Sequence, residues 1–187
     1  TMQIKKIMLA FTLAIGSILT AASRSSYVMI EDDQTALKQL QRDFSKMEKS
    51  TVIGVFDTLA HKEYLTSMQW LLEQGVRLEQ HNIDWMFRSA GFNNKFSTMQ
   101  WFLRCGMVPR QGVINITFVS AIYGGYPILE WMLILPLGNG KPDQNAIKEA
   151  YDNAVKRASD MSEYRDDRKD RKAIVTLLEK YVAKQII

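Results

Sequence analysis

The chain has little cysteine and little histidine. Among its 187 residues are a single cysteine, Cys105, and two histidines, His61 and His81. One cysteine excludes an intrachain disulfide, on which many small secreted proteins rely. A catalytic thiol needs a neighbouring base, and only the two histidines offer an imidazole. We expect Cys105 to be a passive, partly buried thiol at a helix end, and a hydrolase that uses it is the remote alternative.

Motifs that bind metals or activate nucleophiles are also missing. No cysteine pair, His-Glu-x-x-His or Gly-x-Ser-x-Gly occurs, so zinc sites and the common nucleophile elbow lack support. Gly138-Asn139-Gly140-Lys141 is like a phosphate loop only superficially, because its spacing differs and Pro142 replaces the residue that would reach magnesium. The adjacent carboxylates Asp32-Asp33 and Asp166-Asp167 would point apart on a helix, which indicates capping and solvation. We therefore expect no enzyme activity, no metal and no cofactor.

The chain lacks a large excess of one charge. Its formal net charge is +4, which falls by two if Lys5 and Lys6 are removed. In the most charged stretch, residues 165–172, three aspartates are interleaved with the basic residues, which indicates a solvated helix face. Nucleic-acid-binding proteins present a clustered basic face to the phosphates. We therefore expect no nucleic-acid partner. The 47% hydrophobic content favours a packed core.

The chain does contain a repeat marked by tryptophan. Trp70, Trp101 and Trp131 recur at a nearly constant interval along the sequence. Apolar residues stand five and two positions before each tryptophan and one and two positions after it, which places them on one helical face. The small residues ten positions before and the helix breakers five positions after are Ala60, Gly91, Ala121, Gly75, Gly106 and Pro136. The period predicts stacked units of helix, tight turn, helix and a polar loop.

The tryptophans themselves have two interpretations. Equivalent residues of stacked units form a ladder, so the three indoles can fill the space between successive second helices. Alternatively, they form an exposed aromatic strip for a partner.

Segments of these units match a known pattern. Ser120-Ala121 stands where ankyrin repeats have an Ala-Ala pair, and Gly124 stands at their helix-breaking glycine. Leu71-Leu72-Glu73-Gln74-Gly75-Val76 is similar to the Leu-Leu-x-x-Gly-Ala ending of their second helix. No unit keeps the family's Thr-Pro-Leu-His start, and the counterparts of Gly124 are Glu63 and Asn94. The chain thus resembles the divergent, tryptophan-containing ankyrin arrays of some microbial proteins.

This resemblance covers residues 50–145 and implies an all-α fold, a short solenoid of ankyrin-like helix-turn-helix repeats. A generic helical solenoid is the alternative. In ankyrin-like proteins the loops and inner helices hold a protein partner. Carried over by position, the contact candidates are Arg77, Glu79, His81, Trp85, Arg110, Gln111, Asn139 and Lys141. Trp85 can instead pack inward.

The N-terminal segment is similar to an export signal. Lys5-Lys6 precede an apolar run over residues 7–19, and small residues follow as far as Ser23. This order is typical of a secretory signal peptide cleaved after Ala22. A buried first helix or an uncleaved membrane anchor is the alternative, although the run is short for a bilayer core of about 30 Å.

We therefore expect four regions: a signal peptide over 1–22, a linker and N-terminal cap helix over 23–49, ankyrin-like repeats over 50–145, and a degenerate C-terminal repeat with a charged insertion over 146–187. The second region contains an apolar stripe that fits a helix covering the first repeat. The stripe consists of Leu37, Leu40, Phe44 and Met47. A dimerisation or partner helix is the alternative.

The expected function is that of a secreted or periplasmic protein-protein interaction module, such as a microbial effector that binds a host protein. The alternative is a periplasmic or membrane-tethered structural factor held by an uncleaved N-terminal segment, the only case in which we expect a membrane partner.

Overall fold

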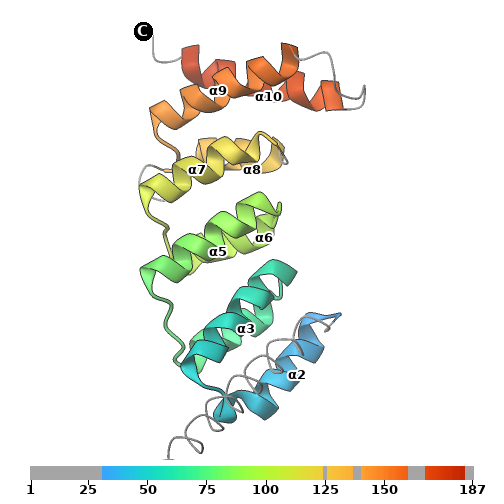
Figure 1. Cartoon of the computed structure of the whole chain (residues 1–187), viewed down its shortest axis with the longest axis vertical. Helices are drawn as coiled ribbons and strands as arrows, with labels where there is room; N and C mark the ends of the chain where they lie inside the picture. The colour runs from blue at the N-terminus through green and yellow to red at the C-terminus, as the bar shows by residue number, and fades with distance from the viewer. Residues whose placement is uncertain (1–30, 124–125, 137–139, 160–166, 184–187) are drawn as a thin grey trace, which may run out of the picture. The chain divides into compact units, whose positions relative to one another are not determined.

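The computed structural model describes residues 31–123, 126–136, 140–159 and 167–183, and all regular elements in these ranges are helices (Figure 1). They are α2 (Asp33–Asp43), the 3-10 helix η1 (Phe44–Lys46), α3 (Lys49–Lys62), α4 (Leu65–Glu73), α5 (Gln80–Phe92), α6 (Phe96–Arg104), α7 (Gln111–Ala121), α8 (Tyr126–Ile134), α9 (Gln144–Ser159) and α10 (Asp167–Ala183). The expected all-α class is confirmed for this part of the chain. The signal peptide expected over 1–22 lies outside the described residues. No helix within them is long and apolar enough to cross a membrane.

The chain divides into two compact units, Thr1–Arg77 and Leu78–Ile187. In the first unit, α4 packs against both α2 and α3. Asp33 of α2 accepts hydrogen bonds from the backbone N–H groups of Thr66 and Ser67 at 2.8 and 3.0 Å. These N–H groups lie in the first turn of α4, where they have no partner within the helix. A carboxylate from a distant part of the sequence therefore supplies the N-terminal hydrogen bonds of α4 and ties α2 to it.

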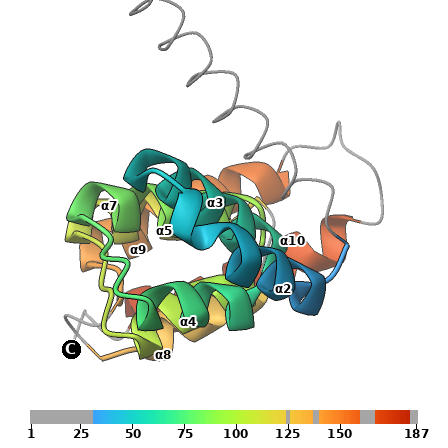
Figure 2. The same ribbon diagram turned by 90° about the horizontal axis from the view of Figure 1, so that it is seen from below.

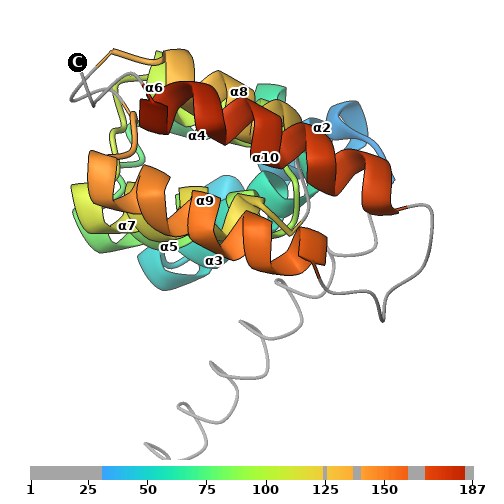
Figure 3. The ribbon, with the colours of Figure 1, turned by 90° about the horizontal axis from the view of Figure 1, so that it is seen from above.

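In the second unit the helices form two layers. The successive first helices α5, α7 and α9 lie side by side in one layer, with contacts from α5 to α7 and from α7 to α9. The other layer consists of α6, α8 and α10, each packed on its preceding helix (Figures 2 and 3). The core between the layers includes Phe87, Phe102 and Phe118, all fully buried. Helix pairs of this kind bury one stripe of each helix against the next.

The apolar positions around the tryptophans are buried in part as the repeat predicts, since the position two after is buried for Leu133 and half-buried for Leu72 and Leu103. The residues two before and one after each tryptophan are all fully buried: Met68, Leu71, Met99, Phe102, Leu129 and Met132. The residues five positions before, Leu65, Phe96 and Tyr126, are half-buried. One face of each second helix therefore forms core, as helical periodicity requires.

The small residue ten positions before the tryptophan allows a close helix contact in the second unit. Gly91 of α5 is buried, and a Cβ atom on it would overlap the Cγ2 atom of Thr117 on α7. Thr117 is itself fully buried. The expectation that this position needs a small residue is confirmed for Gly91, because any larger side chain would push α5 away from α7.

Left-handed residues end four of the helices. Gly75 and Gly106 have φ of 88° and 74° at the expected breaker positions. Glu63 and Asn94, the counterparts of Gly124, have φ of 59° and 55°. The chain therefore keeps the left-handed turn at these two positions without the glycine that adopts it at no steric cost.

The tryptophans pack against other aromatic rings. Trp101 is 7% exposed. Trp70 and Trp131 are half-buried, and Trp131 meets Phe96 of α6 edge-on, with ring centroids 5.2 Å apart. This contact joins α6 to α8 and favours packing as the role of Trp131, and Trp70 makes a similar contact with Phe44 at 5.4 Å in the first unit.

Three expectations about local structure need correction. Cys105 is exposed as a residue because it follows the last turn of α6, although its thiol is partly desolvated as expected. The helix expected to run past Met47 stops at Asp43, and α3 begins at Lys49. Arg171, expected on a solvated helix face, is 7% exposed and donates from its guanidinium to the carbonyl oxygen of Arg157 at 3.1 Å. The burial of its long side chain between α10 and α9 explains the difference.

Candidate interaction surface

Four large apolar side chains are exposed along α5 and α7, and we call them the apolar face: Trp85, Phe92, Ile116 and Tyr123, which are 61%, 59%, 48% and 65% exposed. Trp85 and Phe92 are separated by nearly two helical turns, which places them on one side of α5. Ile116 and Tyr123 occupy the equivalent places one repeat later, in α7 and just beyond its end. Because α5 and α7 are packed together, the four side chains belong to one surface. In α9, Val155 is 39% exposed.

These side chains point outward because the opposite sides of both helices are fixed in the core. In α5 the buried residues are Ile83, Met86, Phe87 and Ala90, and in α7 they are Ile114, Thr117, Phe118 and Ala121. A helix has one such stripe against its neighbours, so a residue across from it must face solvent. The structure therefore answers the question left open for Trp85, which does not pack inward.

The apolar face carries few charges. Helix α7 contains no charged residue, and the only carboxylate within α5, Asp84, is buried. Arg88 lies on α5 between Trp85 and Phe92. The exposed charges of the layer are concentrated on α9: Lys148, Glu149, Asp152 and Lys156. Depletion of charge at the centre with charged residues at the rim is the usual composition of a protein interface.

Two guanidinium groups lie over rings of this face. The Arg88 guanidinium is 5.6 Å from the centroid of the Phe92 ring. The Arg157 guanidinium, from α9, is 4.4 Å from the centroid of Tyr123 and donates to the carbonyl oxygen of Ile122 at 2.8 Å. The two stacks stand at equivalent ends of α5 and α7, and each fixes a cation beside an aromatic ring.

A buried carboxylate anchors the loop that leads into α7. Asp84 accepts a hydrogen bond from the backbone N–H of Arg110 at 2.9 Å, one from the Arg110 guanidinium and one from the Gln80 amide at 3.1 Å. Burial raises the pKa of Asp84, but the three hydrogen bonds and the charge of Arg110 together outweigh it, so the pKa lies below its usual range. Gln80 also donates to the carbonyl oxygen of Val108 at 3.1 Å. We call these contacts the first clamp.

The same arrangement recurs one repeat later as a second clamp. Gln111 donates to Asn115 at 2.9 Å and to the carbonyl oxygen of Lys141 at 3.0 Å. Asn115 in turn exchanges two hydrogen bonds with Asp143, at 2.6 and 3.1 Å. A hydrogen bond from the Ala146 N–H and one from Asn115 lower the pKa of Asp143. Each clamp therefore holds the loop before a first helix to the first helix of the preceding pair.

The clamps change how several predicted contact residues are interpreted. Arg110 and Gln111 are exposed, yet both contribute to the clamps, and Lys141 takes part through its carbonyl oxygen. Nothing in these contacts prevents the outer part of Arg110, whose side chain is 69% exposed, from meeting a partner. Asn139 lies outside the described residues.

The remaining predicted residues lie at helix ends. Glu79 precedes α5 and receives a hydrogen bond on its carboxylate from the first turn, while its N–H donates to Asn82 at 3.2 Å, so it forms a capping box. His81 is exposed, with Nδ1 3.5 Å from the Glu79 carboxylate. Arg77, at the end of the first unit, donates to the carbonyl oxygens of Leu72 and Val76 at 3.4 and 3.2 Å.

Sequence reasoning missed most of the apolar face. Of its four members only Trp85 was a candidate, and Phe92, Ile116 and Tyr123 were not. The sequence does contain a repeat that points to this face. Trp85 and Ile116 are as far apart in the sequence as Trp70 and Trp101, and so are Phe92 and Tyr123. The tryptophan period marks the second helices, where the repeated residues form core, and not the outer side of the first helices.

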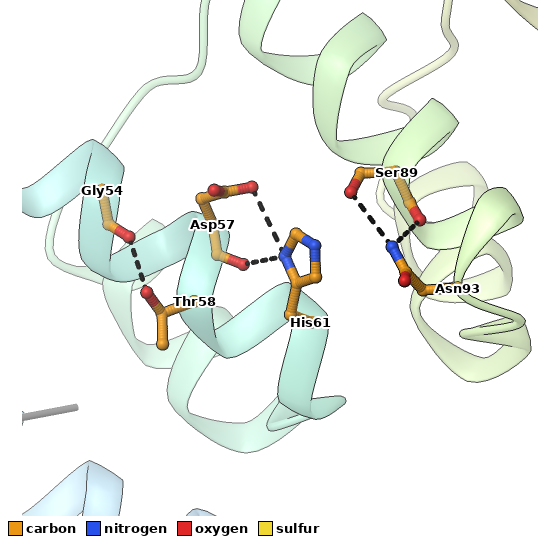
Figure 4. Close-up of polar contacts among 6 residues, drawn as sticks. All are labelled: Gly54, Asp57, Thr58, His61, Ser89 and Asn93. Atoms are coloured by element: carbon orange, nitrogen blue, oxygen red, sulfur yellow. Dashed lines mark hydrogen bonds and ion pairs between the residues drawn. The ribbon is translucent and has the colours of Figure 1, made fainter. Parts of the chain in front are cut away.

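Several other polar side chains of α3 and α5 make contacts within their own helix. Figure 4 shows Thr58 donating to the carbonyl oxygen of Gly54 at 3.0 Å, and His61 Nδ1 3.0 Å from the carbonyl oxygen of Asp57. In α5, Asn93 donates to the carbonyl oxygen of Ser89 at 2.8 Å (Figure 4). These contacts give polar side chains a partner on the backbone of their own helix. Within the described residues, no group of three or more His, Cys, Asp or Glu side chains could hold a metal ion.

A shallow hollow lies on the other layer of the second unit. It has a volume of about 390 Å³ and is lined by Gln100, Leu103, Arg104, Gly106, Val108, Trp131, Leu135 and Pro136. Cys105 adjoins this segment. Although the residue as a whole is exposed, desolvation of its thiol raises the pKa of Cys105. The positive charge of Arg104 lowers this pKa, but by less. A raised pKa leaves less thiolate, which makes the sulfur a poorer nucleophile at neutral pH.

Comparison of the chain with protein-family models, with curated proteins and with solved structures finds no match.

Proposed function

We propose that this protein is an exported protein-protein interaction module, built as a short solenoid of ankyrin-like helix pairs, which binds its partner through the apolar face. The observation that carries the proposal is the exposure of Trp85, Phe92, Ile116 and Tyr123 on two adjacent helices. Exposed apolar patches on soluble proteins mark interaction sites, and tryptophan, tyrosine and arginine dominate interface energetics.

The solenoid part of the proposal rests on repetition in three dimensions. Helix pairs α5–α6, α7–α8 and α9–α10 follow one another, and the clamps repeat with the period of the sequence. The left-handed turns at Glu63 and Asn94 occupy the position of the ankyrin helix-breaking glycine. These features support an ankyrin-like unit more than a generic helical pair.

Binding without catalysis is part of the same proposal. The buried carboxylate Asp84 is committed to hydrogen bonds that hold a loop, and the Cys105 thiol has a raised pKa. Neither group is arranged as an activated nucleophile or base.

The test compares two isoleucines. Ile116 lies on the apolar face and is 48% exposed, while Ile134 of α8 lies on the other layer and is 69% exposed. The full chain, Ile116→Ala and Ile134→Ala would each be used to capture proteins from the surroundings into which the chain is exported, followed by mass spectrometry. We expect wild type and Ile134→Ala to retain the same partner and Ile116→Ala to lose it.

Trp85→Ala is the stronger companion variant, since truncating a central tryptophan of an interface costs about 2 kcal/mol or more of binding free energy. A partner retained equally by wild type, Ile116→Ala and Trp85→Ala would place binding elsewhere. The loop variants Arg77→Ala and Arg110→Ala then show whether the loops contribute as well.

Export itself is tested separately. The apolar run over residues 7–19 supports both a cleaved signal peptide and, as the second candidate, a tether that holds a structural factor on a membrane. N-terminal sequencing of the chain recovered outside the cytoplasm decides between them. A start near Ser23 is expected for the secreted module and excludes the tether.

A further inference from the structure

The apolar face ends in two fixed cations whose hydrogen-bonding capacity is largely unused. Arg88 has no hydrogen bond or ion pair within the part of the chain that the structure describes, and its guanidinium lies over the Phe92 ring. Arg157 donates one hydrogen bond to the Ile122 carbonyl and lies over Tyr123. A guanidinium has five N–H donors, so both groups can still bind an acceptor with their edges while their faces lie on the rings.

Among the residues that the structure describes, the carboxylates of this layer lie away from these two cations. Neither α5 nor α7 has an exposed carboxylate, and Glu79 precedes α5, at the end opposite to Arg88 and Phe92. Glu149 and Asp152 precede Arg157 by about 12 and 8 Å along the α9 axis. Counting only the described residues, the end of the layer formed by Arg88 and Arg157 is therefore positive, while the α9 edge carries both signs.

We propose that the occupant of the apolar face is an acidic amphipathic protein segment. Its apolar side chains cover Trp85 and Ile116, and its carboxylates meet the guanidinium edges of Arg88 and Arg157. This inference rests on the proposed function and adds the chemistry of the partner. The aromatic contact favours this placement of each guanidinium before binding, so less side-chain entropy is lost when a carboxylate arrives.

The charge pattern favours this occupant over two others. A nucleic acid would meet Glu149 and Asp152 on the same layer and only two fixed cations, too few for a phosphate track. A basic segment would bring like charges against Arg88 and Arg157.

The experiment uses a displayed library of random peptides selected on the immobilised full chain. Arg88→Glu reverses one cation of the face, and Arg104→Glu is the matched control, since Arg104 is an exposed arginine at the end of α6. Peptides selected on wild type and on Arg104→Glu should be enriched in Asp and Glu together with Leu, Phe and Trp. Arg88→Glu should lose the acidic enrichment and keep the apolar one.

The strongest selected peptide, made synthetically, provides the quantitative measurement. Its Kd should rise about tenfold in Arg88→Glu, as expected for the loss of one charge-assisted contact, and change little in Arg104→Glu. Its affinity should also fall with added salt, because the contact is only partly buried.

The outcomes separate the two proposals. Selected peptides that are uncharged or basic, but that need Ile116, would overturn the acidic partner and leave the interaction face standing. Peptides that bind Ile116→Ala and Trp85→Ala as well as wild type would overturn both. Specific binding of a single-stranded oligonucleotide in place of peptides, or a concentration-dependent dimer that Arg88→Glu abolishes, would also overturn the acidic segment as occupant.

Discussion

Asp84 in α5 holds Arg110, in the loop that leads into α7, by both its backbone and its side chain. The Asp84 carboxylate is buried, whereas the Arg110 side chain is mostly exposed. The two side chains therefore contribute unequally to the stability of the second unit. The backbone hydrogen bond fixes where α7 begins relative to α5, and this spacing sets the apolar face.

Asp84→Ala should therefore destabilise the second unit more than Arg110→Ala. Removing the carboxylate leaves the Arg110 N–H without its acceptor and the Gln80 amide with only the Val108 carbonyl, which costs about 2–3 kcal/mol. Removing the Arg110 side chain keeps the backbone bond and should cost about 1 kcal/mol or less. Urea denaturation of both single variants and the double variant measures the difference and the coupling. Equal costs would show that the backbone bond contributes little.

Acid should weaken the clamps. The pKa values of Asp84 and Asp143 lie below the usual 3.8, so as pH falls the unfolded chain takes up protons before the folded chain does. The two carboxylates contribute fully to stability at pH values above the usual pKa of 3.8. This contribution is lost as the pH falls through the lower pKa values of the folded chain. Thermal unfolding of wild type and Asp84→Asn, followed from neutral pH to about pH 3, should show a smaller acid-induced drop in Tm for the variant. A parallel decline of both proteins would assign the acid sensitivity to other carboxylates.

Two glycines of the second unit should respond to alanine with opposite signs. Gly106 has φ of 74° and open space around its Cβ position, so Gly106→Ala suffers backbone strain alone, about 1–2 kcal/mol. Gly112 lies within α7, also with open space, and there alanine should stabilise by up to about 1 kcal/mol. Chemical denaturation of the two variants provides the comparison, and each serves as the control for the other. A stabilising Gly106→Ala would contradict the left-handed helix end.

The contact between Gly91 and Thr117 should show strong coupling. Gly91→Ala places a methyl group against the Thr117 Cγ2 atom and should cost about 1–3 kcal/mol despite the better helix propensity of alanine. Thr117→Ser removes that Cγ2 atom, so the double variant should recover part of the loss. A thermodynamic cycle of the four proteins gives the interaction energy. Additive effects would mean that the helices can separate freely at this point.

Part of the fold could be predicted because it depends on local order in the sequence. Met99 and Phe102 are buried and Gly106 is left-handed because the helical period and the needs of a helix end are encoded within a few residues. Asp32 accepts the N–H of Thr35 at 2.8 Å, which confirms the capping role expected for Asp32. Glu63 and Asn94 were recognised as replacements for glycine, but their left-handed backbone was not foreseen, since neither residue requires it.

The candidate site could be predicted only in part. Trp85 was identified by position, but its direction depends on which side of α5 packs against α7. Arg110 was assigned to a partner although Asp84 already engages its guanidinium, a contact between residues that no helical or repeat period relates.

The sequence by itself determined that the chain forms helix pairs at the nearly constant period of its tryptophans, where those helices end, and which face of each second helix is apolar. These properties follow from the spacing of residues along one helix. Only the tertiary structure decided that Phe92, Ile116 and Tyr123 join Trp85 on one surface, and that Arg88 and Arg157 stand at its end. The physical reason is that exposure depends on what the opposite side of a helix packs against, and Gly91 sets that contact by its approach to Thr117.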